Sequence, residues 1–188
     1  MQLEIASMQG TGKIELTGSL GNVMKESARA AVSYVRANAD KYNIGPDFYK
    51  NTDIHIHATE AAVPKDGPTA GVPITPGLIS ALTGTPVARD VAMTGEVTIR
   101  GRVLPIGGLR EKSMAAYTGG VKTVFIPKDN IADLEDVDSR VKENVEFVPV
   151  SNVDEIKTKA LKADKTEKAK EWSFTEIPTN TNAQPLRH

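Results

Sequence analysis

Residues 63–71 read VPKDGPTAG, so two glycines, two prolines and one hydroxyl side chain fall within nine positions. Proline fixes φ and glycine adopts conformations that other residues avoid, which predicts a tight turn with Thr69 at its tip. A run with helical spacing begins directly behind it. Two interpretations are open at this point: a plain surface turn, and a loop held open for a ligand.

The run from Val72 to Leu82 predicts a helix packed on the core. Pro73 falls within the first four helical residues, whose N–H groups need no partner. Pro76 lies deeper, and we expect it to remove one hydrogen bond. Gly84 is expected to end the helix.

Helical and strand patterns interleave along the rest of the chain, as far as about residue 163. We expect strands over 3–8, 13–17, 53–58, 91–94, 121–127 and 145–150, a hairpin over 96–106 turning at Gly101, and helices over 22–42, 107–117, 130–143 and 152–163. Because hairpins interrupt the alternation, we predict an α+β (mixed α/β) fold of small sheets and packed helices. The predicted single domain covers residues 1–163, and residues 164–188, poor in apolar side chains, are expected to form a flexible tail.

Composition excludes several classes of protein. The 188 residues are 39% hydrophobic and 25% charged and carry a net charge of −1, so we expect no nucleic-acid partner. No apolar run reaches the roughly 18–20 residues that span a bilayer, and the start lacks a secretory signal pattern, which predicts a cytoplasmic protein without a membrane partner. The absence of cysteine excludes disulfides, thiol nucleophiles and cysteine-ligated metals.

The turn at residues 9–12, QGTG, is similar to a phosphate-binding loop. The full pattern requires glycine where Ser7 stands and serine or threonine where Ile14 stands. Both ends of the pattern fail, so we exclude ATP binding there.

Residues 53–58 alternate strictly, which predicts a strand with Ile54 and Ile56 on one side and His55 and His57 on the other. Two histidines at this spacing are able to ligate a metal, but no third ligand accompanies them. We therefore predict no metal site. We expect the histidines to line a cleft or to lie on a half-exposed sheet face.

Lys112 lies three or four residues from Leu109, Ala115 and Ala116 on its predicted helix. Such a lysine commonly extends its ammonium to water. In the functional alternative, apolar surroundings and the helix N-terminus behind Gly107 and Gly108 favour the neutral amine. A neutral lysine takes a proton from a hydroxyl nucleophile, the Ser-Lys variant of the catalytic triad.

Six motifs, in order along the chain, together resemble the proteolytic domain of ATP-dependent Lon proteases. They are TGSLG at 17–21, DIHIH at 53–57, DGPTAG at 66–71, AMTGE at 92–96, LPIGGLREK at 104–112 and KTVFIP at 122–127. The resemblance covers roughly residues 3–160. It implies the Lon proteolytic-domain fold and a serine-type endopeptidase with a Ser-Lys dyad.

The resemblance also implies roles for individual residues. Thr69 stands where the family has its nucleophilic serine and Lys112 where it has the dyad lysine, while Thr94 matches the threonine whose hydroxyl helps to hold that lysine. Asp66 lies in the loop whose carboxylate approaches the lysine when the site is inactive. The other matching positions frame the turn or surround the cleft: Gly67, Pro68, His55, His57 and Glu4.

Threonine at position 69 departs from the family pattern Gly-Pro-Ser-Ala-Gly. Threonine keeps the hydroxyl, but its methyl restricts χ1 and crowds a pocket shaped for serine. Three explanations are open: a slow but working Thr-Lys dyad, a degenerate site kept for ring assembly or as a scaffold, and an engineered change. We favour altered or weak peptidase activity.

The partners that the resemblance implies are unfolded or damaged proteins, peptides, and copies of the chain in a hexameric ring. An AAA+ ATPase module, in cis or in trans, would feed the domain. We expect no cofactor in this chain, because ATP and Mg would bind only through that ATPase module.

Overall fold

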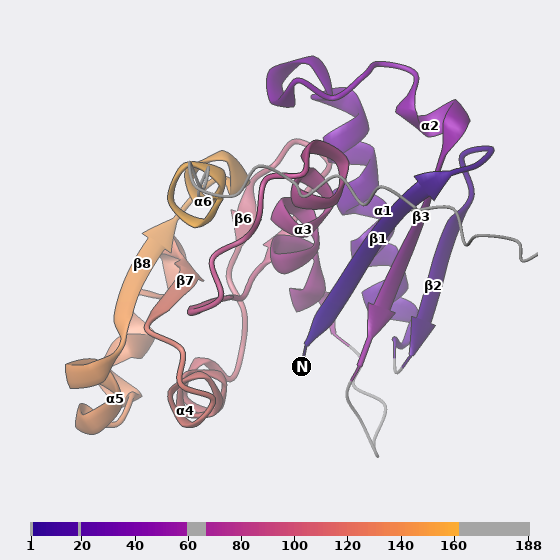
Figure 1. Ribbon diagram of the computed structural model, residues 1–188. Coiled ribbons are helices and arrows are strands. Elements are labelled where there is room, and N and C mark those ends of the chain that lie inside the picture. The colour runs from indigo at the N-terminus through magenta and orange to yellow at the C-terminus, as the bar shows by residue number, and fades with distance from the viewer. Residues whose placement is uncertain (1, 19, 60–66, 162–188) are drawn as a thin grey trace, which may run out of the picture.

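The computed structural model describes residues 2–18, 20–59 and 67–161, which form one body with two small sheets (Figure 1). The first sheet has the strand order β1-β3-β2. Its strands are β1 (Leu3–Gln9), β2 (Ile14–Gly18) and β3 (Thr52–Ala58). β3 is central, antiparallel to β1 and parallel to β2.

Two long helices, α1 (Asn22–Ala37) and α3 (Gly71–Thr83), pack against each other, and α3 also packs on β1 (Figure 1). Alternation within β3 decides which face is covered, because Ile54 and Ile56 are buried while His55 and His57 remain half-buried. The short segments between α1 and β3 are η1 (Asp40–Tyr42) and α2 (Phe48–Asn51).

The second sheet is parallel, with the order β4-β7-β8, and a separate hairpin lies beside it. The sheet strands are β4 (Val91–Met93), β7 (Thr123–Pro127) and β8 (Glu146–Val150), and the hairpin strands are β5 (Glu96–Val97) and β6 (Val103–Leu104). The helices of this half are α4 (Leu109–Thr118), η3 (Lys128–Asn130), η4 (Ala132–Asp136), α5 (Ser139–Asn144) and α6 (Val153–Ala160).

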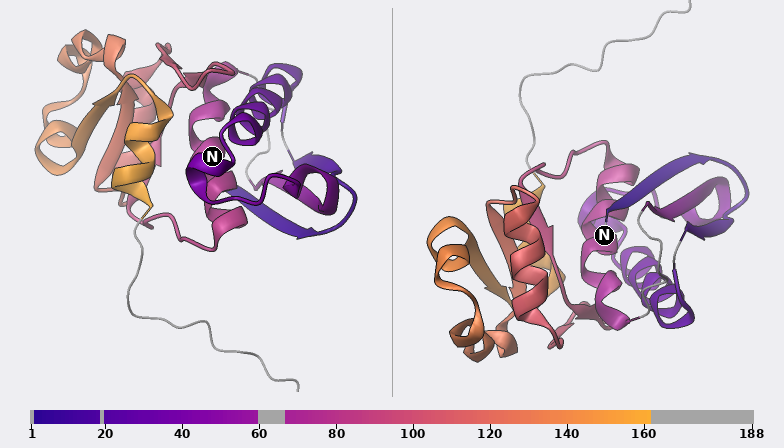
Figure 2. Two further views of the ribbon diagram at one scale, coloured as in Figure 1. Left: turned by 90° about the horizontal axis from the view of Figure 1, so that it is seen from above. Right: turned by 90° about the horizontal axis from the view of Figure 1, so that it is seen from below.

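α3 connects the two halves, lying between the two sheets in Figure 2 and contacting β1, α1, β4, β5 and α6. A helix surrounded on all sides is apolar on all sides, and Val72, Ile74, Leu78 and Ile79 are all buried. They belong to the main core, which extends from α1 to α6. A second, smaller core lies between α4, β7 and α5.

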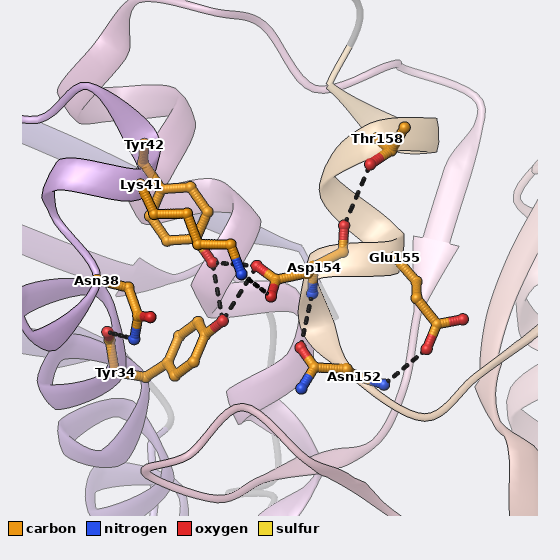
Figure 3. Close-up of polar contacts among 8 residues, drawn as sticks. All are labelled: Tyr34, Asn38, Lys41, Tyr42, Asn152, Asp154, Glu155 and Thr158. Atoms are coloured by element: carbon orange, nitrogen blue, oxygen red, sulfur yellow. Dashed lines mark hydrogen bonds and ion pairs between the residues drawn. The ribbon is translucent and has the colours of Figure 1, made fainter.

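A cluster of polar side chains fixes the last helix to the first half of the chain (Figure 3). Asp154, in the first turn of α6, accepts hydrogen bonds from the hydroxyl groups of Tyr42 at 2.5 Å and Tyr34 at 3.1 Å, and it pairs with Lys41. Burial alone would raise the pKa of Asp154, but the hydrogen bonds from Lys41 and the two tyrosines lower it. Burial and the bond to Asp154 raise the pKa of Tyr42.

The fold class is confirmed: the chain is a single mixed α/β domain with small sheets, one hairpin and packed helices. The helix expected over 22–42 is wrong at its end, since α1 stops at Ala37. Asn38 explains the difference, because its Nδ2 donates to the carbonyl of Tyr34 at 2.9 Å and caps the last turn. The tail expected over 164–188 lies outside the described residues.

Among the helices of residues 2–18, 20–59 and 67–161, none combines the length and the apolar character of a membrane span.

Candidate functional site

The turn that presents Thr69 is a short 3₁₀ segment, η2 (Pro68–Ala70), which leads directly into α3. Thr69 is half-buried there. Ser27 of α1 donates a hydrogen bond from Oγ to the carbonyl oxygen of Pro68 at 2.8 Å, so the first long helix holds the turn. Both interpretations of residues 63–71 predicted a turn. The turn in the structure places the Thr69 hydroxyl at the amino end of a buried helix.

The two glycines that flank the turn differ in how tightly they are packed. A Cβ atom at Gly71 would lie 2.5 Å from Val97 Cγ1 and 2.7 Å from Ser27 Oγ. At Gly67 a Cβ atom would meet nothing within 4 Å, and the backbone there is extended with φ of 178°. Gly71 is therefore required by packing, whereas Gly67 is not required by conformation or by contact.

Gly71→Ala is expected to lower the free energy of unfolding by about 1–3 kcal/mol, because the added methyl overpacks the junction of α1, α3 and β5. Urea denaturation followed by circular dichroism measures the change. Gly67→Ala is the matched control and should shift the free energy of unfolding by less than about 0.5 kcal/mol. Equal losses in both variants would show that the difference in packing has no effect.

Thr94 and Gly95 connect the second sheet to the start of α3 through backbone hydrogen bonds. The Thr94 N–H donates to the carbonyl of Phe125 at 3.1 Å, and the Gly95 carbonyl accepts from the Val72 N–H at 3.3 Å. Gly95 has φ of +150°, and a Cβ there would lie 2.8 Å from Val72 Cγ2. The Thr94–Gly95 segment therefore lies directly against α3, the helix that follows the Thr69 turn.

The side chain of Thr94 is buried, being 6% exposed, yet its Oγ1 has no hydrogen-bond partner. Among the described residues it is the one buried side-chain nitrogen or oxygen atom in this condition. A buried hydroxyl without a partner costs roughly 1–3 kcal/mol, so the position is occupied at a cost to stability.

Lys112 lies in the first half of α4 and its side chain is exposed, so the expected apolar surroundings are wrong. The buried stripe of α4 consists of Leu109, Ser113 and Ala116, and Lys112 lies at its flank. The lysine Nζ donates to the carbonyl oxygen of Gly107 at 2.9 Å. The expected position behind the two glycines at the start of this helix is correct.

No hydrogen bond joins Thr69 to Lys112 in the described part of the chain, where the amine is bound to Gly107 instead. α4 begins near the carboxyl end of the parallel sheet, where Thr94 also lies, and the carbonyl of Gly95 binds the N–H of Val72 at the start of α3. Asp66, the third residue expected beside them, falls outside the described residues.

His55, His57 and Glu4 line a pocket of about 420 Å³ on the first sheet. Thr17 bridges the two imidazoles, with its Oγ1 2.7 Å from His55 Nε2 and 2.7 Å from His57 Nδ1. The hydroxyl has one proton, so it donates to one ring and accepts from the other when both histidines are neutral. Within the described ranges, no three histidine, aspartate or glutamate side chains are grouped to hold a metal.

The sequence model of the Lon protease (S16) C-terminal proteolytic domain matches residues 1–163. The chain belongs to this family. Lon protease of Vibrio parahaemolyticus is 54% identical over 166 residues, covering 88% of this chain and 21% of the relative. Lon protease of Brevibacillus choshinensis is 52% identical over 161 residues (86% and 21%), and Lon protease 1 of Bacillus subtilis 51% over 165 residues (88% and 21%).

The resemblance stated from the motifs is thereby confirmed. The chain spans about a fifth of the length of the curated Lon proteases that it matches.

Three polar residues of this Lon proteolytic domain were missed in the sequence: Ser27, Thr17 and Asn130. Ser27 holds the Thr69 turn, Thr17 bridges the histidines, and Asn130 binds the loop before α4. Only Thr17 gave a signal, since it lies in one of the Lon motifs. Its contact with His57 depends on the pairing of β2 with β3, which no local pattern specifies.

Proposed function

We propose that this chain is a peptide-hydrolysing Lon-type domain in which Thr69 is the nucleophile and Lys112 the general base. The unpartnered hydroxyl of Thr94 is the observation that carries the proposal. Uncompensated buried polar atoms persist where function needs them. A hydroxyl oxygen is a suitable acceptor for a lysine amine, which would leave Gly107 and turn toward Thr94 and Thr69.

In the proposed reaction Thr69 Oγ1 attacks the peptide carbonyl carbon and passes its proton to the neutral Lys112 Nζ. The resulting oxyanion would be held by the N–H of Thr69 and of a neighbouring loop residue at the start of α3. Lys112 then gives its proton to the leaving amine, and an ester on Thr69 remains. Water, deprotonated by the same lysine, hydrolyses the ester and restores the hydroxyl.

Catalysis requires Lys112 in another arrangement than the exposed one that the structure describes. Bound to Gly107 and open to solvent, the amine is not placed to accept a proton from Thr69. Movement into the neighbourhood of Thr94 would remove it from water, which favours the neutral form. The Lon resemblance implies that the carboxylate of Asp66 would approach this amine when the site is inactive.

The larger assembly is part of the proposal. An AAA+ module that binds ATP and Mg would unfold protein substrates and pass them to this domain, and six copies would form a ring. In the absence of that module, we expect ATP-independent cleavage of short or unfolded peptides.

Cleavage of a fluorogenic peptide tests the dyad directly. Thr69→Ala and Lys112→Ala should each reduce cleavage to the background rate, because one lacks the nucleophile and the other lacks the base. Thr118→Ala and Lys122→Ala are matched controls at exposed positions and should keep the wild-type rate. Full activity of Lys112→Ala would exclude lysine as the base.

A second function, assembly of a ring without catalysis, is favoured by the branched side chain at position 69 and by the lack of a bond between Thr69 and Lys112. It predicts that the wild-type chain and Thr69→Ala are equally inactive. Sedimentation of both would then show the same oligomer, and added DNA should leave the oligomer unchanged.

A further inference from the structure

Asn130 is a buried side chain that the proposed reaction does not use. It ends η3, directly behind β7, and is 3% exposed. Its Oδ1 accepts from the N–H of Ile106 at 3.0 Å, and its Nδ2 donates to the carbonyl oxygen of Ile106 at 2.9 Å and to Asp133 Oδ2 at 2.5 Å. One amide therefore holds both backbone polar groups of a residue distant in sequence.

Ile106 directly precedes the glycine segment, Gly107 and Gly108, whose backbone is intrinsically flexible. At Gly107 a Cβ atom would meet nothing within 4 Å, and Gly108 adopts a left-handed φ of +71° before α4 begins. Glycine loses more conformational entropy on folding than any other residue, so two in succession give the chain little rigidity of its own. Contacts from outside the two glycines must therefore fix the position of Ile106.

The position of Lys112 depends on this segment at two points. The carbonyl of Gly107 accepts from Lys112 Nζ at 2.9 Å, and the carbonyl of Gly108 accepts from the Lys112 N–H at 3.1 Å. A displacement of the two glycines therefore displaces the start of α4 and with it Lys112, also after the amine has left Gly107 for Thr94. Asn130 holds Ile106, the residue that directly precedes the two glycines.

We propose that Asn130 is a positioning residue for the dyad: its bidentate amide clamp on Ile106 sets the place of the glycine segment and hence of Lys112. This inference rests on the function proposed above. Only an amide offers an acceptor to the Ile106 N–H together with donors to the Ile106 carbonyl and to Asp133. A carboxylate of the same shape would set oxygen against both of those acceptors.

Asn130→Asp, made in the Thr69→Ser chain, tests the clamp with minimal change of volume. We expect kcat for a fluorogenic peptide, corrected for the folded fraction, to fall about 100-fold while KM changes by less than about twofold. The control is Asn38→Ala, which removes an amide hydrogen bond to Tyr34 at the end of α1. It should lower stability and leave kcat unchanged.

Amide hydrogen exchange gives a measurement that does not need cleavage. In Asn130→Asp the amides of residues 106–112 should exchange at least about tenfold faster, because both hydrogen bonds donated by Nδ2 are lost, and Asn38→Ala should leave them unchanged. If Asn130→Asp does not fold, Asn130→Ser, whose short side chain cannot hold both polar groups of Ile106, takes its place.

An unchanged kcat per folded molecule overturns the proposal, because a merely structural asparagine would lower stability alone. If the Thr69→Ser parent cleaves nothing, the function proposed above fails first. The clamp is then judged by exchange alone: faster exchange confined to residues 106–112 supports it, and unchanged exchange overturns it.

Discussion

Thr69→Ser is expected to raise the rate of peptide cleavage by about 100-fold. Both side chains carry the attacking hydroxyl, but the threonine methyl limits χ1 and needs space in a half-buried turn. A displacement of the attacking oxygen by about 1 Å costs on the order of 100-fold in rate, and serine removes the cause of that displacement. The measurement is kcat/KM for a fluorogenic peptide.

Two further variants are the controls for this result. Thr69→Ala should be inactive, which shows that the hydroxyl is the attacking group. Thr118→Ser makes the same exchange on an exposed part of α4 and should keep the wild-type rate. A Thr69→Ser chain slower than wild type would mean that the site is shaped for threonine, contrary to the crowding argument.

The same comparison separates two of the three explanations for threonine, a slow dyad and a degenerate site. A gain with a measurable wild-type rate supports a slow dyad. A gain from no activity supports a site that decayed at one residue, because the turn, Lys112 and Thr94 would have remained competent. No measurable cleavage by either the wild-type or the Thr69→Ser chain would support the assembly function.

Local patterns were sufficient to predict most elements of the fold. Strict alternation in residues 53–58 placed Ile54 and Ile56 in the core, and apolar spacing behind the Thr69 turn predicted α3 up to Gly84. Both signals depend only on the period of the element and on glycine chemistry. The end of α1 was missed, because one asparagine side chain closed the helix earlier than its periodicity suggested.

The arrangement of the site was predictable only in part, because its decisive contacts join distant segments. Ser27 reaches Pro68 across the packing of α1 on the η2 turn, and Asn130 reaches Ile106 from the end of η3. Neither residue has a local pattern that marks it. Lys112 shows the opposite error, since its spacing suggested an apolar stripe whose true centre lies one position further on, at Ser113.

Thr94→Val is expected to stabilise the fold and to impair the reaction. Valine has nearly the shape of threonine and removes the buried Oγ1 that lacks a partner, so the free energy of unfolding should rise by about 1–2 kcal/mol. If Lys112 must bind this hydroxyl to reach Thr69, cleavage by a Thr69→Ser chain should fall on the order of 100-fold. Urea denaturation and peptide cleavage measure the two effects.

Thr75→Val is the matched control, since Thr75 is equally buried but its Oγ1 donates to the Gly71 carbonyl at 2.9 Å. There the same exchange removes a made hydrogen bond and should lower the free energy of unfolding by about 1 kcal/mol. Opposite signs in the two variants would identify the Thr94 hydroxyl as a group kept at the expense of stability. A Thr94→Val chain that is less stable and equally active would contradict both its orphaned state and its proposed role in holding Lys112.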